Sequence, residues 1–480
     1  MRPYDLVIIG GGPAGYSCAL RGAQLNASIA LIEDRKLGGT CLNRGCIPTK
    51  VLYQGVKSLQ ELRKSDAYGL YAGEVDLTRE SKINIDKLLD FKEEKVTELV
   101  EGIDSLLKSR KVDVILGKGC LKSDNVIEVE ENTGEKYTMT SKTVVLATGS
   151  KPNEKIMGPE LSAQCWWADD LVAGREFWEN SGQEIAIIGG GVIGVELSTI
   201  LSILGKKVTL IEVESRLLPP FDTDIKKRIG THLKKLGINV HTNSVVYDII
   251  SSEDNTKRKL AMRKKEKEIT MEVDDVILSV GREPNFSGID VENLGLDIRH
   301  DYILTDYKMK TNLKNVYAAG DIVTKGPQLA HVATHQGKVA AENALNFGNS
   351  YFDDTAVPNC VFSFPQIAEV GFSEQECKTK EIPYKVGKFN FRSNAKAMIM
   401  QEEGFVKIIS DVRTDEILGM HIIGPNASDL IQEGTVAVKH KLKSDELIKT
   451  IHPHPTLSEA IWEAGLDLND KALHQISLRK

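Results

Sequence analysis

Residues 4–20 read YDLVIIGGGPAGYSCAL and residues 183–200 read QEIAIIGGGVIGVELSTI, so one pattern occurs twice in the chain. Each copy predicts a β-strand, a tight glycine turn and a helix. The glycines stand at matching positions of the two turns: Gly10, Gly12 and Gly15, and Gly189, Gly191 and Gly194. Glycine lets the backbone turn tightly and approach a pyrophosphate, whose charge then meets the amides of the helix N-terminus. The repeat therefore predicts two dinucleotide-binding units.

Each unit continues to a second predicted strand that ends in an acidic residue. Glu33 and Glu212 each follow the third glycine of their unit by 18 residues. A carboxylate at this position accepts the hydroxyls of a ribose. At Glu212 it would also repel the 2′-phosphate of NADP, so the second unit is expected to prefer NAD. A simple tight turn would explain one copy, but not two copies that both keep the acidic residue.

Composition narrows the class of protein. The 480 residues allow about three domains, and the net charge of −7 gives no electrostatic support for a nucleic-acid partner. Seven cysteines are too few, and odd in number, for an extracellular disulfide framework. No apolar run reaches the roughly 18 residues of a membrane span. We therefore expect a cytoplasmic protein without a membrane span, and a mature organelle matrix protein would show the same features.

Further along the chain, predicted strands at 142–150, 274–285 and 315–321 end at glycines, including Gly149 and Gly281. Such junctions place backbone beside a ligand at the carboxyl edge of a parallel sheet. Residues 86–110 carry apolar side chains at helical spacing and predict an amphipathic helix whose apolar stripe packs on residues 50–64: Leu89, Val96, Leu99, Ile103 and Leu106. From about residue 350, alternating strands and two late helices predict a separate α+β domain.

The segment GGTCLNRGCIPTK at 38–50 holds the two cysteines that stand close together, Cys41 and Cys46. In a regular helix their Cα atoms would lie about 8.6 Å apart, beyond the about 7 Å that a disulfide tolerates. A bridge would need the helix to distort, which Gly45 and Pro48 allow, and a strained bridge is easily reduced. The alternatives are two inert thiols or a metal pair, and a metal is disfavoured because no second ligand pair stands nearby.

Six motifs together carry a resemblance to a known family: GGTCLNRGCIPTK (38–50), ATG (147–149), GGGVIGVE (189–196), GREPN (281–285), YAAGD (317–321) and HPHPTLSEA (452–460). The chain resembles the flavin-dependent pyridine nucleotide-disulfide oxidoreductases over essentially its whole length, and among them the dihydrolipoamide dehydrogenases. The resemblance implies an α/β fold with two Rossmann-like domains and a dimerisation domain. The implied regions are an FAD-binding domain (1–150), an NAD-binding domain (151–280), a central region completing the FAD domain (281–350) and a C-terminal α+β dimerisation domain (351–480).

The resemblance also implies roles for the reactive side chains. Cys41 would exchange with a substrate dithiol, and Cys46 would be the thiolate that lies against the flavin. His454 would be the base, because an imidazole takes and returns a proton near neutral pH, and Glu459 would orient it. Residues 456–459 also match a capping box, so Glu459 could instead cap the following helix, and both roles can hold together.

The remaining assignments concern the cofactors. On the FAD side, Glu33 would bind the adenosine ribose, Asp321 would lie on the flavin side, and Lys50 would contact the flavin with Glu196 as its carboxylate partner. Three features of the sequence keep no assigned role: Arg44 between the cysteines, Gln336 where many relatives have glutamate, and the pair Trp166-Trp167.

The implied activity is the oxidation of protein-bound dihydrolipoyl groups, with electrons passing through Cys41 and Cys46 and FAD to NAD⁺. The implied partners are the lipoyl domains of a multienzyme complex and a second copy of the chain, whose C-terminal histidine would complete the site. A glutathione-type reductase would favour NADPH, against which Glu212 and Gly194 argue. A mercuric-type reductase would carry a C-terminal cysteine pair, whereas the last cysteine here is Cys377. A non-catalytic subunit is disfavoured because the reactive side chains are intact.

Overall fold

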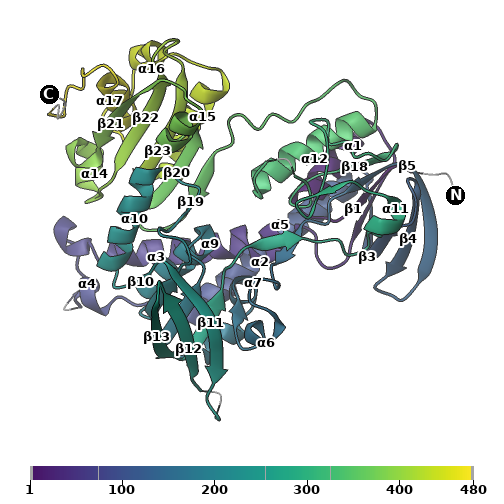
Figure 1. Cartoon of the computed structure of the whole chain (residues 1–480), viewed down its shortest axis with the longest axis horizontal. Helices are drawn as coiled ribbons and strands as arrows, with labels where there is room; N and C mark the ends of the chain where they lie inside the picture. The colour runs from purple at the N-terminus through teal and green to yellow at the C-terminus, as the bar shows by residue number, and fades with distance from the viewer. Residues whose placement is uncertain (1–3, 74, 255, 325, 477–480) are drawn as a thin grey trace.

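The computed structural model describes residues 4–73, 75–254, 256–324 and 326–476. The sheet that holds the N-terminal strand lies at one end of the molecule and the C-terminal sheet lies toward the other (Figure 1). A second parallel sheet and an antiparallel meander lie between and below them in the same view.

The first sheet is built from strands that are far apart in the sequence. Its parallel part has the order β3-β2-β1-β5-β18, and the last strand reaches β5 after a long excursion of the chain. β3 and β5 continue beyond this part and pair antiparallel with β4. The strands are β1 (Tyr4–Ile9), β2 (Ile29–Glu33), β3 (Asp113–Leu121), β4 (Val126–Glu131), β5 (Lys136–Leu146) and β18 (Val316–Ala318). Residues 281–350 thus return to the first sheet.

Two helices cover this sheet and pack closely on each other. α1 (Pro13–Gln24) follows the first glycine turn, and α12 (Ala330–Ala344) comes from the returning segment. A Cβ atom at Gly337 in α12 would lie 2.1 Å from the carbonyl oxygen of Ala14 in α1, so the two backbones touch where glycine stands. Gln336 beside it is fully buried and accepts a hydrogen bond from the amide of Gly320 at 2.8 Å, which ties α12 to the YAAGD turn.

The second sheet is entirely parallel, in the order β10-β9-β8-β14-β7. Its strands are β7 (Trp166–Trp167), β8 (Glu184–Ile188), β9 (Lys207–Ile211), β10 (Asn239–His241) and β14 (Asp275–Leu278). The two tryptophans form its edge strand, and Trp166 donates from its indole nitrogen to Asp275 at 3.0 Å. Next to the sheet are α7 (Ala168–Ala173), α9 (Val192–Ile203), α10 (Thr223–Lys235) and the meander β11 (Ser244–Ser251), β12 (Arg258–Lys264) and β13 (Lys267–Val273).

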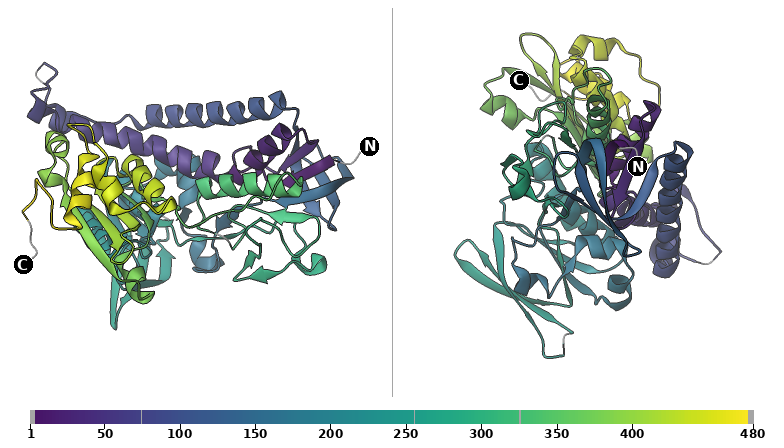
Figure 2. Two further views of the ribbon diagram at one scale, coloured as in Figure 1. Left: turned by 90° about the horizontal axis from the view of Figure 1, so that it is seen from above. Right: turned by 90° about the vertical axis from the view of Figure 1, so that its right-hand side faces the viewer.

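Three helices carry the cysteine segment and its support: α2 (Gly39–Arg44), α3 (Cys46–Leu62) and α5 (Ile85–Ser109). Figure 2 shows α5 as the long helix along one side of the molecule. It packs on α3 as predicted, and Leu89 is buried there. The expected stripe was partly wrong, because Leu99 and Leu106 are 44% and 53% exposed while Leu107 is fully buried. Helical spacing gives the direction of a side chain but not the element that covers it.

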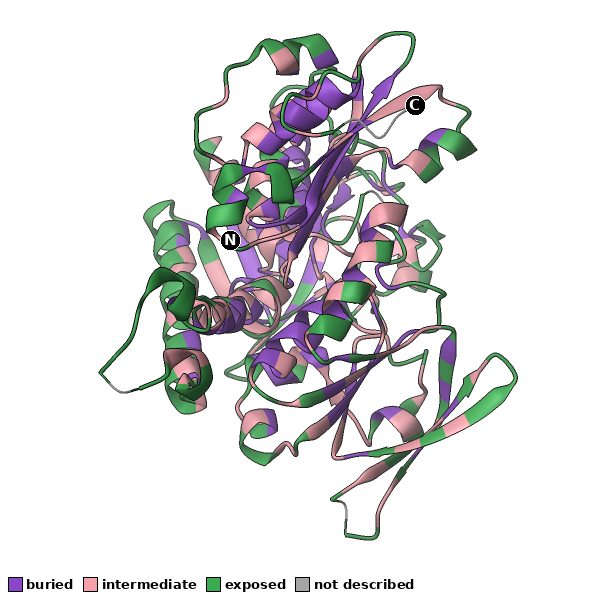
Figure 3. Cartoon of the chain, turned by 90° about the vertical axis from the view of Figure 1, so that its left-hand side faces the viewer, coloured by how far each residue is buried: buried purple, intermediate pink, exposed green. Residues whose placement is uncertain are grey.

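The C-terminal region is an antiparallel sheet with helices packed on it. Its order is β19-β20-β23-β22-β21, and the three middle strands of the five are largely buried (Figure 3). The strands are β19 (Asn359–Val361), β20 (Gln366–Gly371), β21 (Tyr384–Asn390), β22 (Phe405–Asp411) and β23 (Ile417–Gly424). The longer helices are α15 (Ala427–Lys439) and α17 (Glu459–Asp467). A Cβ atom at Gly387 would lie 2.0 Å from the Ala464 carbonyl oxygen, so glycine lets α17 lie directly on β21.

The shorter elements connect these layers. They are α4 (Leu77–Glu80), α6 (Pro159–Ser162), α8 (Glu176–Asn180), α11 (Val291–Leu294), α13 (Glu374–Thr379), α14 (Ala395–Ile399), α16 (Ser444–Lys449), β6 (Ser150–Pro152), β15 (Arg282–Pro284), β16 (Ile298–Arg299) and β17 (Tyr302–Ile303). Within the described residues, no helix is both long enough and apolar enough to cross a membrane.

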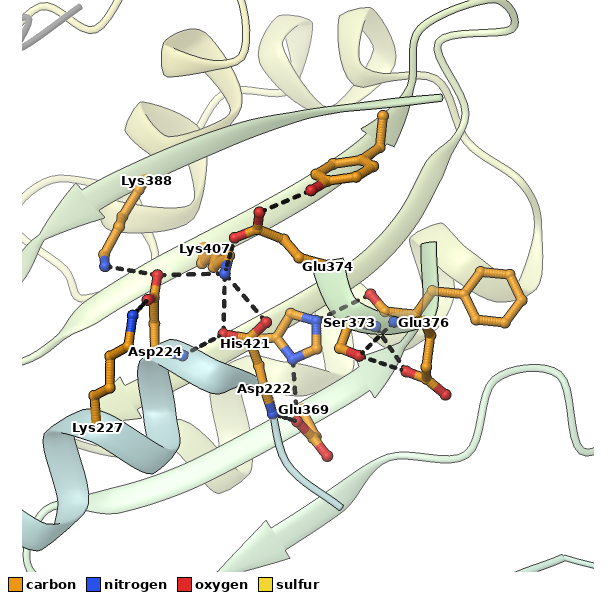
Figure 4. A network of polar contacts seen from close by, with 12 residues as sticks. Asp222, Asp224, Lys227, Glu369, Ser373, Glu374, Glu376, Lys388, Lys407 and His421 are labelled. Atoms are coloured by element: carbon orange, nitrogen blue, oxygen red, sulfur yellow. Dashed lines mark hydrogen bonds and ion pairs between the residues drawn. The ribbon is translucent and has the colours of Figure 1, made fainter. Parts of the chain in front are cut away.

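A buried ionic network joins the second unit to the C-terminal sheet (Figure 4). Lys407 of β22 contacts Asp222 and Asp224, which stand at the start of α10, at 2.9 and 3.3 Å. The side chains of Lys407 and Asp222 are 1% and 0% exposed. His421 of β23 is equally buried and contacts Glu369 of β20 at 3.1 Å. Because an unpaired buried ion is costly, these contacts hold α10 on the C-terminal sheet.

Candidate functional site

The outer glycines of each turn are required by the packing of the turn itself. Gly10 and Gly189 have φ values of +106° and +108°, which other residues rarely adopt. A Cβ atom at Gly15 would lie 1.8 Å from the Gly10 carbonyl oxygen, and one at Gly194 would lie 1.9 Å from the Gly189 carbonyl oxygen. The third glycine of each turn therefore lets the helix start directly against the preceding strand.

The middle glycines have a different reason. A Cβ atom at Gly12 would meet its nearest neighbour, Gly39, at 3.8 Å, and one at Gly191 would meet nothing within 4 Å. Both residues are the N-caps of their helices, α1 and α9, and both line the same cavity. A side chain there would fill the space in front of the helix amides, which is where a pyrophosphate binds in such turns.

The acidic residues of the two units hold the turns in the same way. Glu33 accepts a hydrogen bond from the Gly11 amide at 2.7 Å, and Glu212 accepts one from the Gly190 amide at 2.6 Å. Both glutamates are 6% exposed and line the cavity. Burial raises the pKa of Glu33 to about 7. Each predicted ribose ligand therefore also fixes the backbone of its own glycine turn, a role that the sequence did not reveal.

One continuous cavity of about 2690 Å³ connects both units, and this exceeds the about 300–1,000 Å³ of a site for one small ligand. The predicted site residues that line it are Gly10, Gly12, Glu33, Cys41, Cys46, Lys50, Gly149, Gly189, Gly191, Glu196, Glu212, Gly281 and Asp321. The predicted residues that do not line it are Gly15, Gly194, His454 and Glu459. The two glycines pack within their turns, whereas His454 and Glu459 belong to the C-terminal region.

The cysteine pair stands where the helix is interrupted. Gly45, with φ −145° and ψ −110°, separates α2 from α3, as the predicted distortion requires. Cys46 is the first residue of the 17-residue helix α3, where a thiolate is favoured by the helix dipole. The Cys41 thiol hydrogen-bonds to Cys46, and this bond together with the charge of Lys50 lowers the pKa of Cys46 to about 7. The same bond and burial raise the pKa of Cys41.

An ion pair connects the cysteine helix to the second unit. The Nζ of Lys50 in α3 lies 3.0 and 2.9 Å from the two carboxylate oxygens of Glu196 in α9. Glu196 is 3% exposed and also accepts a hydrogen bond from the Phe362 amide at 2.8 Å. The Lys50 ammonium lies 4.4 Å from the centre of the Phe362 ring. These contacts satisfy both charges in the cavity wall, and no motif in the sequence pointed to Phe362.

Asp321 belongs to a second polar chain that crosses the cavity wall. Ser150 donates from its hydroxyl to Asp321 at 2.7 Å, and Arg282 donates from Nε to the same hydroxyl at 2.8 Å. Arg282 also donates to both oxygens of Asp169 at 2.7 and 2.9 Å. Arg282 lies in the GREPN motif and Asp169 follows the tryptophan pair, so the residue types were visible in the sequence but their contact was not.

The predicted base and its carboxylate partner lie at the start of α17. His454 contacts one oxygen of Glu459 through Nδ1 at 2.8 Å, and the Thr456 amide donates to the other oxygen at 2.8 Å. One carboxylate thus contacts both His454 and the Thr456 amide. The capping box expected over residues 456–459 was wrong, because α17 begins at Glu459 itself with Ser458 as its N-cap. The His454 side chain is 70% exposed. His452, in contrast, contacts Glu433 at 2.8 Å with a side chain that is 6% exposed.

All seven cysteines fall within the described residues, and none is in a disulfide there. Across the same part of the chain, no group of three or more His, Cys, Asp or Glu side chains is placed to hold a metal ion. Arg44 lies in the last turn of α2 and lines the cavity, and nothing in the structure explains its charge there.

Comparison with known proteins identifies the family. The sequence profile of the pyridine nucleotide-disulphide oxidoreductases matches residues 4–337, and the profile of their dimerisation domain matches residues 357–465. The chain belongs to the pyridine nucleotide-disulphide oxidoreductase family. This confirms the predicted combination of two Rossmann-like domains with a C-terminal dimerisation domain. The exact domain boundaries stay predictions.

Individual members of the pyridine nucleotide-disulphide oxidoreductase family match over nearly the full length. Dihydrolipoyl dehydrogenase of Bacillus subtilis is 38% identical, over 98% of this chain and 99% of that protein. Dihydrolipoamide dehydrogenase of Chaetomium thermophilum is 36% identical, over 98% and 92%. Dihydrolipoyl dehydrogenase 2, mitochondrial, of Arabidopsis thaliana is 34% identical, over 98% and 91%.

The residues of this family member fit two dinucleotides. The turn at Gly12, the carboxylates of Glu33 and Asp321, and Lys50 fit FAD, because all of them line the cavity that the cysteine pair also lines. The turn at Gly191 and Glu212, which line the same cavity, fit NAD. The open space in front of each middle glycine is the feature that this fit requires.

Proposed function

We propose that the protein oxidises protein-bound dihydrolipoyl groups to the lipoyl disulfide and reduces NAD⁺. The observation that carries the proposal is the position of Cys46, at the N-terminus of α3, beside the Lys50–Glu196 pair and in a cavity that both glycine turns line. This arrangement supports a stabilised Cys46 thiolate in the same cavity as both proposed dinucleotide sites. The names of the most similar relatives, which are dihydrolipoyl dehydrogenases, supply the substrate class.

In the reaction, His454 of one copy takes a proton from a dihydrolipoyl thiol near Cys41 of its partner. Glu459 keeps the imidazole oriented, because the Nδ1 contact leaves Nε2 to accept the proton. The resulting substrate thiolate attacks Cys41 of the Cys41–Cys46 disulfide, so that a substrate–Cys41 bond forms and Cys46 leaves as a thiolate.

The second substrate thiol then attacks the mixed disulfide. The lipoyl S–S bond forms, the bond to Cys41 breaks, and Cys41 takes up the proton that His454 held; His454 then accepts the proton of the second substrate thiol. The substrate has lost two electrons and the cysteine pair has gained them. Cys46 remains as a thiolate because the Cys41 thiol donates to it and Lys50 lies nearby.

FAD, when bound, supplies the chemistry that moves the electron pair from the cysteines onward as a hydride to NAD⁺. The chain positions the groups for this step. Lys50 is held by Glu196 at the cavity wall, so its positive charge stays on α3 about one turn from Cys46. Glu212 gives the second site its preference for NAD over NADP by repelling a 2′-phosphate.

The assembly is inferred from the same arrangement. His454 and Glu459 do not line the cavity of their own chain, and the dimerisation profile covers residues 357–465. We therefore infer a homodimer with its interface in residues 350–480, so that a monomer would be inactive. The lipoyl domains of a multienzyme complex would be the substrate carriers. The sparse cysteines support a reducing compartment, the cytoplasm or an organelle matrix.

The test is steady-state oxidation of dihydrolipoamide by the purified flavoprotein, with NAD⁺ and NADP⁺ compared at equal concentration. Glutathione disulfide with NADPH serves as the competing reaction in the same preparation. We expect turnover with dihydrolipoamide and NAD⁺ and a clear preference over NADP⁺. Preference for NADPH and glutathione disulfide would overturn the proposal.

A further inference from the structure

The chain crosses twice between the first sheet and the second, and the two crossings pair with each other. β6 (Ser150–Pro152) leads out of the first sheet and β15 (Arg282–Pro284) leads back, as an antiparallel ribbon. Backbone bonds extend the ribbon at both ends, from the Asn153 amide to the Gly281 carbonyl at 3.1 Å and from the Asn285 amide to the Gly149 carbonyl at 2.9 Å. Any change in the angle between the two units must bend this ribbon.

One side chain fastens the ribbon to both units. Arg282 uses Nε and one terminal nitrogen on the hydroxyl and carbonyl of Ser150, at 2.8 and 3.0 Å. Its other terminal nitrogen donates to both oxygens of Asp169, which lies in α7 directly after the edge strand of the second sheet. The Ser150 hydroxyl in turn donates a hydrogen bond to Asp321 at 2.7 Å, and Asp321 lies in the turn that follows β18 of the first sheet.

The environment makes these contacts stiff. The side chains of Arg282 and Asp169 are 14% and 12% exposed, so water screens the pair little. A guanidinium that donates in two directions through a rigid planar fork fixes orientation as well as distance. Arg175, which contacts Asp90 and Glu93 with all three side chains at least 30% exposed, offers no comparable restraint.

We propose that Arg282 is a positioning residue for hydride transfer, because it sets the orientation of the NAD-binding unit relative to the flavin-binding unit. The inference rests on the proposed function. Hydride transfer needs the two dinucleotides aligned, and a misplacement of about 1 Å can cost about 10²-fold in rate. Reduction of the Cys41–Cys46 pair by a dithiol needs no dinucleotide in the second unit, and the Lys50–Glu196 pair that joins this unit to the cysteine helix does not depend on Arg282. We therefore expect Arg282 to affect reoxidation by NAD⁺ much more than reduction by the dithiol.

Two variants of the flavin-loaded enzyme test this, Arg282→Met and the milder Asp169→Asn. The second keeps the Arg282 contact to Ser150, and with it the link to Asp321, and weakens only the link to α7. Stopped-flow measurement gives the two half-reactions separately: reduction by dihydrolipoamide, and reoxidation of the reduced enzyme by NAD⁺. We expect reoxidation to slow by about tenfold or more in both variants, and reduction by dihydrolipoamide to change by less than about twofold.

A second readout does not depend on activity. Hydrogen exchange, resolved by peptide, should show the amides of Asn153 and Asn285 exchanging at least about tenfold faster in both variants, because the ribbon is no longer fastened. Arg263→Met is the matched control. This variant removes an arginine of the second unit. The Arg263 side chain is 59% exposed and lies 3.7 Å from Glu268. We expect it to change neither the rate of either half-reaction nor the exchange rate of the ribbon amides.

The outcomes separate the two proposals. If both half-reactions slow equally, or if neither slows, the positioning role of Arg282 is wrong. If the unmodified enzyme is not reduced by dihydrolipoamide at all, the proposed function fails, and the exchange of the ribbon amides still reports whether Arg282 fastens the two units.

Discussion

Removing the sulfur of Cys41 should change the acidity of Cys46. The thiol of Cys41 hydrogen-bonds to Cys46 and is the largest cause of its low pKa, about 7 against the ordinary value of 9 for a thiol. Cys41→Ala removes this donor and leaves Lys50 and the start of α3 in place. Cys41→Ser is the matched control, because a hydroxyl can donate the same bond. We expect the pKa of Cys46 to return toward 9 in the alanine variant and to stay near 7 in the serine variant.

The expected rates can be worked out from these two pKa values. At pH 7 a thiol with a pKa of 7 is half ionised, whereas one with a pKa of 9 is about 1% ionised, a difference of about 50-fold. The more basic thiolate is about eightfold more nucleophilic, for a Brønsted coefficient of about 0.45. Alkylation of Cys46 should therefore be about sixfold slower in the alanine variant at pH 7. At pH 10, where both thiols are mostly ionised, the alanine variant should be about sevenfold faster.

The assay is alkylation by iodoacetamide between pH 6 and 10, with Cys46 followed in its own peptide by mass spectrometry. The crossing of the two pH profiles separates a change in pKa from a change in access, which would shift the rate equally at every pH. The long-wavelength absorbance of the flavin-loaded variants gives a second titration of the thiolate. If the alanine and serine variants titrate together, the hydrogen bond from Cys41 is not the cause of the low pKa.

Three further predictions concern the C-terminal region. Lys407→Met should destabilise the protein by about 3–5 kcal/mol in urea unfolding, because it strands the buried Asp222 carboxylate, and adding Asp222→Asn should restore part of the loss. Burial opposes the charge on His421, but neighbouring carboxylates outweigh it and raise its pKa. The stabilising effect of protonated His421 is therefore full below pH about 6.5 and is lost as the pH rises through the higher pKa of the folded state. The difference in thermal midpoint between the unmodified protein and His421→Gln should shrink from pH 6 to pH 9. A constant difference would exclude a protonated His421. Glu459→Gln should lower dihydrolipoamide turnover by about tenfold or more with little change in thermal midpoint. Glu459→Ala should lower both the turnover and the thermal midpoint. Equal turnover in the unmodified enzyme and the glutamine variant would show that His454 needs no carboxylate.

The glycine turns could be predicted closely because their constraint is local. Gly10 and Gly189 need a positive φ, and the third glycine of each turn must lack a side chain because the first glycine's carbonyl oxygen lies too close to it. The spacing of the glycines therefore indicates the geometry of the turn. The interruption at Gly45 could be expected from the distance between Cys41 and Cys46 in a regular helix. Each of these inferences uses residues a few positions apart, where backbone geometry alone relates sequence to structure.

The long-range polar contacts could not be predicted in the same way. Arg282 and Asp169 are 113 residues apart, and Lys407 and Asp222 are 185 apart. Their residue types are compatible with an exposed position on a helix or strand, and only the packing of two units brings them together. Leu99 shows that a pattern of spacing can also predict burial wrongly. Its position in α5 matches a buried stripe, yet it stays 44% exposed.

The two glycine turns separate the part of the binding site that a fingerprint predicts from the part that it leaves open. Glu33 and Glu212 hold their turns through equivalent amides at 2.7 and 2.6 Å, so the two turns have nearly the same geometry. The choice between FAD and NAD must therefore come from the residues that come after each turn. After the first turn, α2 brings Cys41 to the cavity; after the second, Val213 lines it with a side chain that is 60% exposed. The repeated pattern predicts that each turn binds a dinucleotide. The residues after each turn, which differ between the two units, determine which of the two dinucleotides has the cysteine pair as its redox partner.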